Sequence, residues 1–445
     1  MAKSDSFVSA FRLAAPYIHT FRGKIFVIAF GGEVVQGGKF VALVHDLNLL
    51  ESLGVHLVLV HGTRPQIEAR LQKTDHQSQF VRGLRVTDAE ILAVVKEATG
   101  TVRVEIEALL SMGLPNSPMA GSDIRVASGN SVTARPMGVI DGVDLQHTGT
   151  VRKIDADGIK RRLEDEEIVL LSPLGYSPTG EVFNLALEDV ATSAAIALKA
   201  DKLIFLMDGP GMLDKRGKLL SEITAHDAEA ELAKNNKQPE DIRLYVPCAI
   251  RACKESVGRC HIIDRNIDGG LLSELFTRAG IGTMVTRDPL EKLRTATIQD
   301  VGGIIRLIEP LEAEGILVKR SREQIEMEIN NFSVLDYDGT IIGCVAFFPF
   351  QGEKAAELAC MAVDPAYRNL GRGDTLLTHI ETRAKKSGIR NLFVLSARSF
   401  HWFIERGFEE TTVELLPDQK QKNYSYERRS KVLVKRLIGK KKGIP

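Results

Sequence analysis

Residues able to do chemistry gather around a glycine-rich turn in the second half of the chain. The run VDPAYRNLGRGDTLL (363–377) follows an apolar stretch and opens a segment with helical spacing. Glycines in such a turn let backbone N–H groups point at one position, and the dipole of the following helix favours an anion there. Arg368 and Arg372 add positive charge beside Gly371 and Gly373. The turn is therefore predicted to hold a phosphate group.

The length and composition of the chain limit the functions in which this turn can take part. At 445 residues the chain exceeds what one hydrophobic core usually covers, so two domains are expected. The 58 basic and 58 acidic residues give a formal net charge of +0, which argues against nucleic acid or a membrane surface as the partner. No apolar run reaches the roughly 18 to 20 residues needed to span a bilayer. We expect a soluble, cytoplasmic protein that acts on small molecules or binds protein partners.

The cysteines carry no metal or disulfide pattern. The five of them, Cys248, Cys253, Cys260, Cys344 and Cys360, are an odd number and lack a CxxC spacing. Neither a disulfide framework nor a zinc site is therefore predicted. Reduced thiols and no bound metal are expected.

The first part of the chain alternates apolar strands with helical stretches. The segments KIFVIAFGG (24–32) and VHLVLVHGTRP (55–65) each end in a glycine-containing turn, and further apolar runs follow at 167–172 and 202–211. Strands of this kind separated by helices are typical of βαβ units with a parallel sheet. An α/β domain up to about residue 286 is predicted.

The N-terminal segment is predicted to be an arm helix that packs on a partner surface. Residues 7–18 place Phe7, Phe11 and Ile18 near one helical face. Pro16 is expected to end or kink this helix.

A charged stretch separates the two halves. Residues 287–294 (RDPLEKLR) lie between differently patterned regions and are expected to form a linker between domains at 1–286 and 295–445. Beyond the linker, Ser321 and Gln324 have the spacing of a capping box at a helix start. Strands in a meander, a helix, a strand, a helix and a last strand follow.

The quoted turn resembles the pyrophosphate loop of GCN5-related N-acetyltransferases. The match is carried by V-x-P-x-x-R-x-x-G-x-G after a strand and by WFIERGF (402–408), within residues 295–437. The resemblance implies an α/β domain that binds acetyl-CoA, with the pyrophosphate on the amides of residues 368–373 and the pantetheine arm along residues 361–363. The cofactor-binding residues so implied are Met361, Ala362, Val363, Arg368, Asn369, Leu370, Gly371, Arg372 and Gly373.

Acetylation of an amine needs a group that accepts its proton, and optionally an acid for the leaving thiolate. Glu357, on the strand leading into the turn, is the candidate base; its alternative is a solvated strand residue. The family often has a tyrosine acid where this chain has Phe403. Ser396, at the end of NLFVLS, is the candidate acid, with a hydroxyl bonded to backbone as the alternative.

The first domain resembles the amino acid kinase fold, above all N-acetylglutamate kinase. FGGEVV, HGTRPQI, GLRVTDAE, FNLALEDVA and ELFTRAGIGT carry the match, which implies a three-layer domain with a mainly parallel sheet. The chain departs from the kinase where phosphoryl transfer needs charge. An expected lysine is Ala29, a triple glycine reads Gly62-Thr63-Arg64, and the expected asparagine and aspartate are Ala186 and Glu188. Kinase activity is therefore predicted to be absent.

Together the two halves resemble the bacterial N-acetylglutamate synthase family of amino-acid acetyltransferases. The resemblance implies L-glutamate as the amine substrate and feedback inhibition by L-arginine. It implies that Arg320 and Arg429 bind the carboxylates of glutamate, because planar guanidinium groups suit carboxylates. Cys360 is a candidate for lining the same pocket. Each arginine alone would more often be a surface residue, and Cys360 a small buried filler.

For the effector, the resemblance implies Tyr17 as a cover over arginine, Glu274 as partner of its guanidinium, Gly280 as a backbone contact and Lys218 as a weaker candidate for its carboxylate. Tyr17 could equally pack between subunits of a homo-oligomer, such as a hexamer. Two other functions stay open from sequence: an N-acetylglutamate kinase with an appended regulatory domain, and a non-catalytic sensor of arginine and acetyl-CoA.

Overall fold

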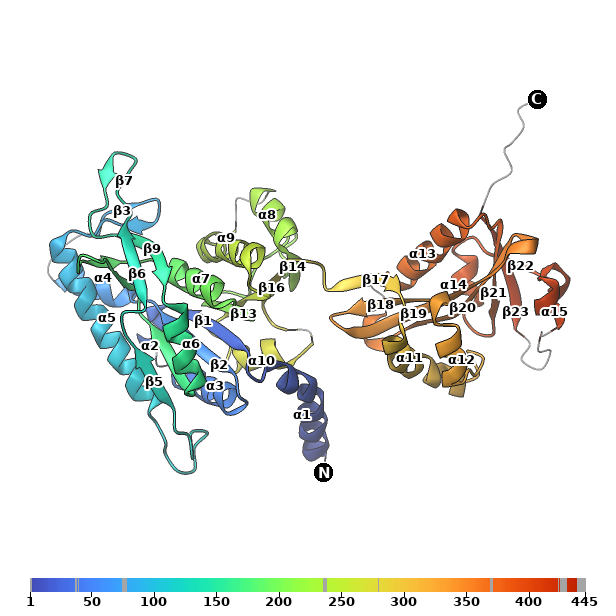
Figure 1. Ribbon diagram of the computed structural model, residues 1–445, viewed down its shortest axis with the longest axis horizontal. Coiled ribbons are helices and arrows are strands. Elements are labelled where there is room, and N and C mark those ends of the chain that lie inside the picture. The colour runs from blue at the N-terminus through green and yellow to red at the C-terminus, as the bar shows by residue number, and fades with distance from the viewer. Residues whose placement is uncertain are drawn as a thin grey trace. The chain divides into compact units, whose positions relative to one another are not determined.

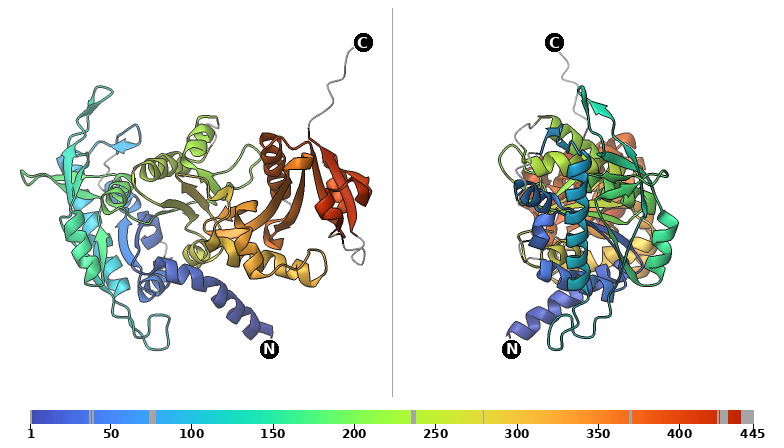
Figure 2. Two further views of the ribbon diagram at one scale, coloured as in Figure 1. Left: turned by 45° about the vertical axis from the view of Figure 1, so that its right-hand side comes forward. Right: turned by 90° about the vertical axis from the view of Figure 1, so that its left-hand side faces the viewer.

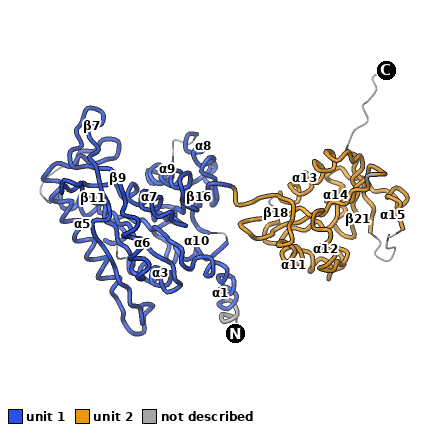
Figure 3. Tube along the Cα trace, in the orientation of Figure 1, with its two compact units in different colours: residues 1–288 blue, residues 289–445 orange. Residues whose placement is uncertain are grey.

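The computed structural model describes residues 2–36, 38, 40–73, 78–234, 238–278, 280–368, 371–422, 424 and 430–437. The chain divides into two compact units, Met1–Asp288 and Pro289–Pro445 (Figure 3). Within the described ranges, no helix is long and apolar enough to cross a membrane.

The first unit is built on an eight-stranded sheet (Figure 1). In spatial order its strands are β14 (Glu222–Thr224), β16 (Thr283–Thr286), β15 (Arg259–Asp264), β13 (Lys202–Met207), β1 (Ile25–Phe30), β2 (His56–His61), β10 (Glu167–Leu171) and β5 (Arg125–Ser128). All neighbouring pairs are parallel except β15 and β16. The continuous apolar runs predicted as buried parallel strands therefore form the centre of this sheet.

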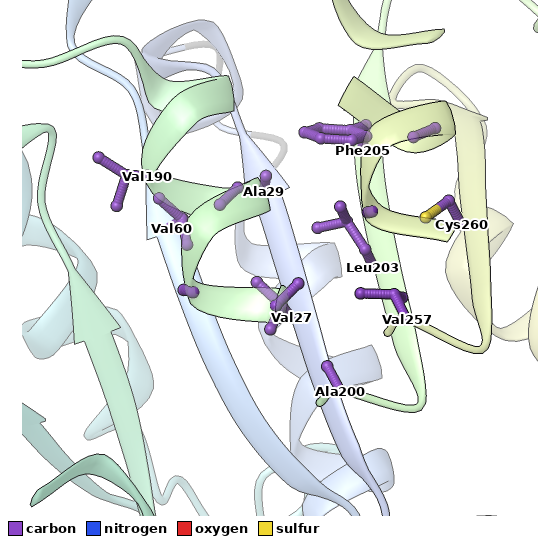
Figure 4. Packing of buried hydrophobic residues seen from close by; sticks show 14 of the residues in the cluster. Val27, Ala29, Val60, Val190, Ala200, Leu203, Phe205, Val257 and Cys260 are labelled. Carbon is purple, nitrogen blue, oxygen red and sulfur yellow. The ribbon is translucent and has the colours of Figure 1, made fainter. Parts of the chain in front are cut away.

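Helices cover both faces of the sheet, so the unit has three layers. Side chains alternate along β1: Val27 and Ala29 pack with α6, α7, α8 and α9, and Phe26, Ile28 and Phe30 pack with α2, α3, α5 and α10. Figure 4 shows part of the core that contains Val27 and Ala29, with Leu203 of β13 beside Val27. Phe205 lies opposite Ala29 in the register of β1 and β13. The helices are α1 (Ala2–Phe21), α2 (Gly32–Gln36), α3 (Phe40–Ser52), α4 (Arg64–Lys73), α5 (Ala89–Leu110), α6 (Ala156–Glu164), α7 (Leu187–Leu198), α8 (Ala225–Lys234), α9 (Glu240–Glu255) and α10 (Gly270–Phe276).

Smaller elements complete this unit. A second sheet runs in the order β12 (Val182–Asn184), β11 (Leu174–Tyr176), β6 (Val132–Pro136) and β9 (Gly149–Ile154), and two short pairs are β3 (Phe80–Val81) with β4 (Leu84–Arg85) and β7 (Val139–Ile140) with β8 (Val143–Asp144).

The arm helix α1 is longer than the sequence indicated. It continues through Pro16 to Phe21, so the expected end at the proline does not occur. Figure 2 shows α1 extending away from the body of the first unit. Its C-terminal end is anchored by Phe21, whose ring packs edge-on against Phe26 and Phe276.

The second unit is a seven-stranded, mainly antiparallel sheet with helices on both faces (Figure 1). Its strands run in the order β17 (Glu291–Thr295), β18 (Phe332–Tyr337), β19 (Thr340–Phe350), β20 (Ala355–Val363), β21 (Asn391–Ser396), β23 (Lys431–Arg436) and β22 (Glu409–Thr411). The helices are α11 (Val301–Ala313), α12 (Arg322–Met327), α13 (Arg372–Lys386), α14 (Phe400–Ile404) and α15 (Asp418–Lys422).

Part of the expected linker is a strand. Residues 291–295 form β17, which pairs with β18 from Glu291 opposite Tyr337 to Thr295 opposite Ser333. The capping box predicted at Ser321 and Gln324 is present at the start of α12. The linker expectation is thus shortened to the few residues before β17, because pairing with a neighbouring strand satisfies the backbone of this charged segment.

Candidate active site

Two strands of the second unit separate where the predicted base lies. β20 and β21 are parallel and pair only as far as Glu357 opposite Phe393. Residues 358–363 of β20 continue beyond this point without pairing to β21. Their backbone groups on that side must be satisfied by something other than the neighbouring strand. The divergence leaves an edge along which an extended chain such as pantetheine can hydrogen-bond.

A bulge in β20 sits beside this divergence. The register between β19 and β20 shifts between Cys344 and Ala346, which lie opposite Ala362 and Ala359. Cys360, within the bulge, has a positive φ of 49°. A residue other than glycine in this conformation is uncommon, and bulges re-aim side chains next to functional sites. Burial raises the pKa of the Cys360 thiol to about 11, so the thiol stays protonated.

The glycine-rich turn begins a long helix. Gly371 has a φ of 76° and is the N-cap of α13, with no side chain capping the first turn. A Cβ atom on Gly373 would lie 3.0 Å from Cζ2 of Trp402 and 3.5 Å from Cε of Met361. The start of α13 is therefore pressed close to these two side chains. Asn369 and Leu370 lie outside the described residues.

The two arginines of the turn differ in their partners. Arg368 is exposed, and its Nε donates to the carbonyl of Val363 at 3.2 Å. Arg372 is mostly buried and is held by Glu291 of β17, with Nε and Nη2 at 2.8 and 2.7 Å from Oε2. The charge of Arg372 is therefore balanced within the protein, while that of Arg368 faces solvent.

Glu357 lines a cavity of about 390 Å³. Arg320, Glu328, Phe348 and Lys420 line the same cavity. Two ion pairs cross it: Arg320 Nη1 lies 2.6 Å from Glu328 Oε2, and Lys420 Nζ lies 2.7 Å from Glu357 Oε2. The cavity thus holds two cations and two carboxylates within reach of an incoming charged molecule.

Arg320 is held in this cavity by contacts of its side chain and its backbone. Its guanidinium lies over the ring of Phe348, 5.0 Å from the centroid, and its backbone N–H donates to Glu312. Its Nε is buried and has no hydrogen-bond partner among the described residues. A buried donor without a partner costs free energy that an anionic ligand can recover.

The other predicted residues of this region are dispersed. Ser396 is buried at the end of β21 and is not among the residues that line the cavity. Arg429 lies outside the described residues. Phe403, where the family often has tyrosine, packs in the core edge-on against Trp402 and Phe408. Lys420 was missed from sequence because PDQKQK (417–422) carries no motif.

In the first unit, the predicted effector residues Glu274 and Gly280 come together. Glu274 is buried; its Oε1 lies 2.7 Å from Nδ1 of His261, and its Oε2 accepts from the amides of Ile281 and Gly282. Burial opposes ionisation, but these hydrogen bonds outweigh it and lower the pKa of Glu274 to about 2. A Cβ atom on Gly280 would lie 2.6 Å from Glu274 Oε2.

The other two effector candidates lie elsewhere in the unit. Tyr17 is partly buried near the end of α1, with its ring 6.0 Å from that of Phe21, which in turn contacts Phe276 of α10. Lys218 is exposed on a turn closed by its amide donating to Asp214.

The residues that depart from the kinase pattern lie in β1 and at the start of α7. Ala29 is buried in β1, Ala186 is the N-cap of α7 and makes no side-chain cap, and burial raises the pKa of Glu188. His61, at the end of β2, is buried beside Ser172, and burial lowers its pKa to about 4. The lysine and aspartate that phosphoryl transfer would use are thus replaced by Ala29 and Glu188.

Both units match known families. Residues 24–264 match the amino acid kinase family, and residues 304–408 match the acetyltransferase (GNAT) family. The fold and the cavity thus define a protein in which an amino acid kinase fold is joined to an acetyltransferase domain.

Full-length relatives narrow this class. The chain is 51% identical to the amino-acid acetyltransferase of Ralstonia nicotianae, over 98% of this chain and 96% of that protein, and 53% identical to that of Ectopseudomonas mendocina, over 97% and 99%. It belongs to the amino-acid acetyltransferase family. The crystal structure of N-acetylglutamate synthase from Neisseria gonorrhoeae complexed with coenzyme A and L-arginine is 37% identical, with a TM-score of 0.90 over 97% of this chain and 100% of that one. The predicted family and fold class are confirmed.

Proposed function

We propose that this protein transfers the acetyl group of acetyl-CoA to the α-amine of L-glutamate, giving N-acetylglutamate and CoA, as the first step of arginine biosynthesis. The observation that carries the proposal is that the buried carboxylate of Glu357 shares one cavity with the half-buried cations Arg320 and Lys420, beside the divergence of β20 and β21. The N. gonorrhoeae structures are complexed with coenzyme A and either L-arginine or N-acetyl-glutamate. They support acetyl-CoA, L-glutamate and L-arginine as the ligands proposed for this protein.

Acetyl-CoA would bind along β20 and the start of α13. The strand edge at Met361, Ala362 and Val363 would offer backbone groups to the pantetheine arm, and the amides at the start of α13 would bind the pyrophosphate. Arg368 adds an exposed positive charge, whereas Arg372 acts by holding the turn in place through Glu291. The acetyl thioester supplies the carbon that the amine attacks.

Glu357 would take the proton from the amine of glutamate. The carboxylate is buried and lies on the strand that leads into the cofactor turn, which brings amine and thioester to one place. Ser396 remains the candidate donor to the leaving thiolate.

Arg320 and Arg429 would bind the carboxylates of glutamate. Nε of Arg320 is a buried donor still available to an anion, and its position over Phe348 fixes its direction. Cys360 would shape the wall between Arg320 and Glu357, as the effects of both on its pKa indicate that they are close to it.

L-Arginine would inhibit by binding to the first unit. The ionised Glu274 carboxylate beside Gly280 suits a guanidinium, and Tyr17 would cover the ligand from α1. Lys218 is the weaker candidate for the arginine carboxylate. We propose that the protein acts as a homo-oligomer, because α1 exposes Phe7, Phe11 and Leu13, an apolar surface that a second copy can cover.

The test is thiol release from acetyl-CoA across a panel of amino acids, with and without arginine. We expect release with L-glutamate that arginine suppresses. Glu357→Gln should lower the rate by roughly 10²- to 10⁴-fold while acetyl-CoA binding, measured by calorimetry, persists. Release with another amino acid and not with glutamate would overturn the substrate.

A further inference from the structure

Lys420 reaches the proposed proton acceptor from a distant part of the chain. It extends from α15 into the cavity, and its ion pair with Glu357 leaves 8% of the Glu357 side chain and 25% of the Lys420 side chain exposed. α15 is fixed by Gln421, whose amide donates to the carbonyls of Glu414 and Leu416. A carboxylate buried to this degree needs a cation or several donors. Lys420 is its cation in the structure.

The position of Lys420 is the position that the substrate amine requires. A group that gives its proton to a carboxylate must come within about 2.6 to 3.2 Å of it. Nζ of Lys420 lies 2.7 Å from Glu357 Oε2, inside this range. Lys420 and the amine of an amino acid each present a nitrogen whose N–H groups donate to a carboxylate, so they are chemically alike. They compete for the same carboxylate.

The charges of the cavity show where Lys420 would go. Arg320 and Lys420 balance Glu328 and Glu357, so the four side chains sum to zero. An amino acid with two carboxylates and one ammonium adds a net charge of −1. Its amine displaces Lys420 from Glu357, and one of its carboxylates lies close enough to receive Lys420.

Resting on the proposed function, we infer that Lys420 exchanges partners during the reaction: it pairs with Glu357 before the dicarboxylic amino acid binds and with a carboxylate of that amino acid afterwards. Before and after the amino acid binds, the Glu357 carboxylate is therefore paired with an ammonium group. A carboxylate of the bound amino acid is paired with Lys420. The exchange makes Lys420 a substrate-binding residue that sets the preference for an acidic amino acid.

The exchange also favours release of product. Acetylation converts the ammonium into a neutral amide, which can no longer act as the cation of Glu357. Of the two protons that the nitrogen loses, one ends on the CoA thiolate and one in solvent. Once Glu357 has given up the proton that it accepted, Lys420 returns to the Glu357 carboxylate, and the product loses one of the cations that held its carboxylates.

Steady-state kinetics test the substrate-binding role. Lys420→Gln should raise KM for L-glutamate by roughly 10- to 100-fold with a much smaller change in kcat and in KM for acetyl-CoA. Lys420→Arg should recover most of the loss. Lys422→Gln is the matched control, because Lys422 is exposed on the same helix and does not line the cavity. An unchanged glutamate KM with a lower kcat would show a counter-ion only and overturn the exchange.

Binding of N-acetylglutamate tests the exchange without turnover. In Glu357→Gln, Lys420 has lost its partner in the protein, so N-acetylglutamate should bind several-fold more tightly than to the unsubstituted protein. The gain should disappear in the double variant Glu357→Gln, Lys420→Gln. Equal or weaker binding to Glu357→Gln would overturn the exchange, and calorimetry reports it even if Lys420→Gln alone folds poorly.

The two proposals fail differently. If the unsubstituted protein neither acetylates glutamate nor binds N-acetylglutamate, the proposed function falls and the exchange falls with it. If it does both, and the Lys420 variants leave these affinities unchanged, only the exchange falls.

Discussion

Arg372, at the first position of α13, is bound to Glu291, at the first position of β17, although 81 residues separate them in the sequence. The guanidinium also lies over the ring of Tyr367 and donates to its carbonyl oxygen. The start of the helix that follows the cofactor turn is therefore tied to the first strand of the second unit.

Removing the charge of Glu291 should weaken acetyl-CoA binding. We expect Glu291→Gln to raise KM for acetyl-CoA by roughly 3- to 10-fold, because Arg372 loses its ion-pair partner and no longer fixes the turn. kcat at saturating acetyl-CoA should change little. Lys292→Gln, at the exposed neighbouring position of β17, is the control. Equal KM values for the two variants would mean that the pair does not position the turn.

Glu291→Gln should also alter the effect of CoA on the binding of arginine. Glu274 holds the amides of Ile281 and Gly282 just before β16, and the chain enters the second unit after Asp288, three residues before Glu291. If arginine acts through this covalent path, the dissociation constant of arginine should depend on CoA in the unsubstituted protein and much less so in Glu291→Gln. Calorimetric titration of arginine with and without CoA measures both. An equal dependence in the two proteins would exclude Glu291 from the path.

Gly373 should not tolerate a side chain. An added Cβ would lie 3.0 Å from Trp402, so the start of α13 or the indole must shift. We expect Gly373→Ala to raise KM for acetyl-CoA at least several-fold and to change the fluorescence of Trp402, the single tryptophan of the chain. Gly302→Ala, in the first turn of α11, is the control, because an added Cβ would meet no atom within 4 Å beyond its chain neighbours and its own helix backbone. Unchanged fluorescence and KM in Gly373→Ala would contradict the close packing.

His61 should make the first unit sensitive to mild acid. Its pKa is lowered from 6.5 to about 4 by burial, with a further contribution from the charge of Arg103. The unfolded chain binds a proton below about pH 6.5 that the folded chain does not bind until about pH 4, so stability is lost as pH falls through this window. The loss is on the order of 3 kcal/mol.

Calorimetry at pH 7, 5.5 and 4 on the full chain and on His61→Gln checks this. The difference in unfolding free energy between the two proteins should shrink or reverse as pH falls, because glutamine does not titrate. A difference that is independent of pH would contradict the lowered pKa. Fluorescence of Trp402 follows the second unit separately.

The sequence by itself determined the elements whose residues specify local structure. Strands such as β1, β2, β10 and β13 were predictable because a parallel strand covered on both faces is apolar throughout. The capping box at Ser321 depends only on residues three apart. The turn at 368–373 could be singled out because its two arginines and two glycines fall within six consecutive residues. Pro16 misled the prediction for α1, which continues through it.

Which charged side chains form ion pairs depends on the tertiary structure. Lys420 faces Glu357 and Arg372 faces Glu291 because sheet pairing and helix packing bring distant segments together, and no local pattern encodes those contacts. β17 became a strand through its register with β18, although its charged sequence suggested a linker. From the sequence, the types of groups that acetyl transfer would need could be predicted. Which cation each carboxylate holds depends on the folded chain, because ion pairs require distances of a few ångströms between residues remote in sequence.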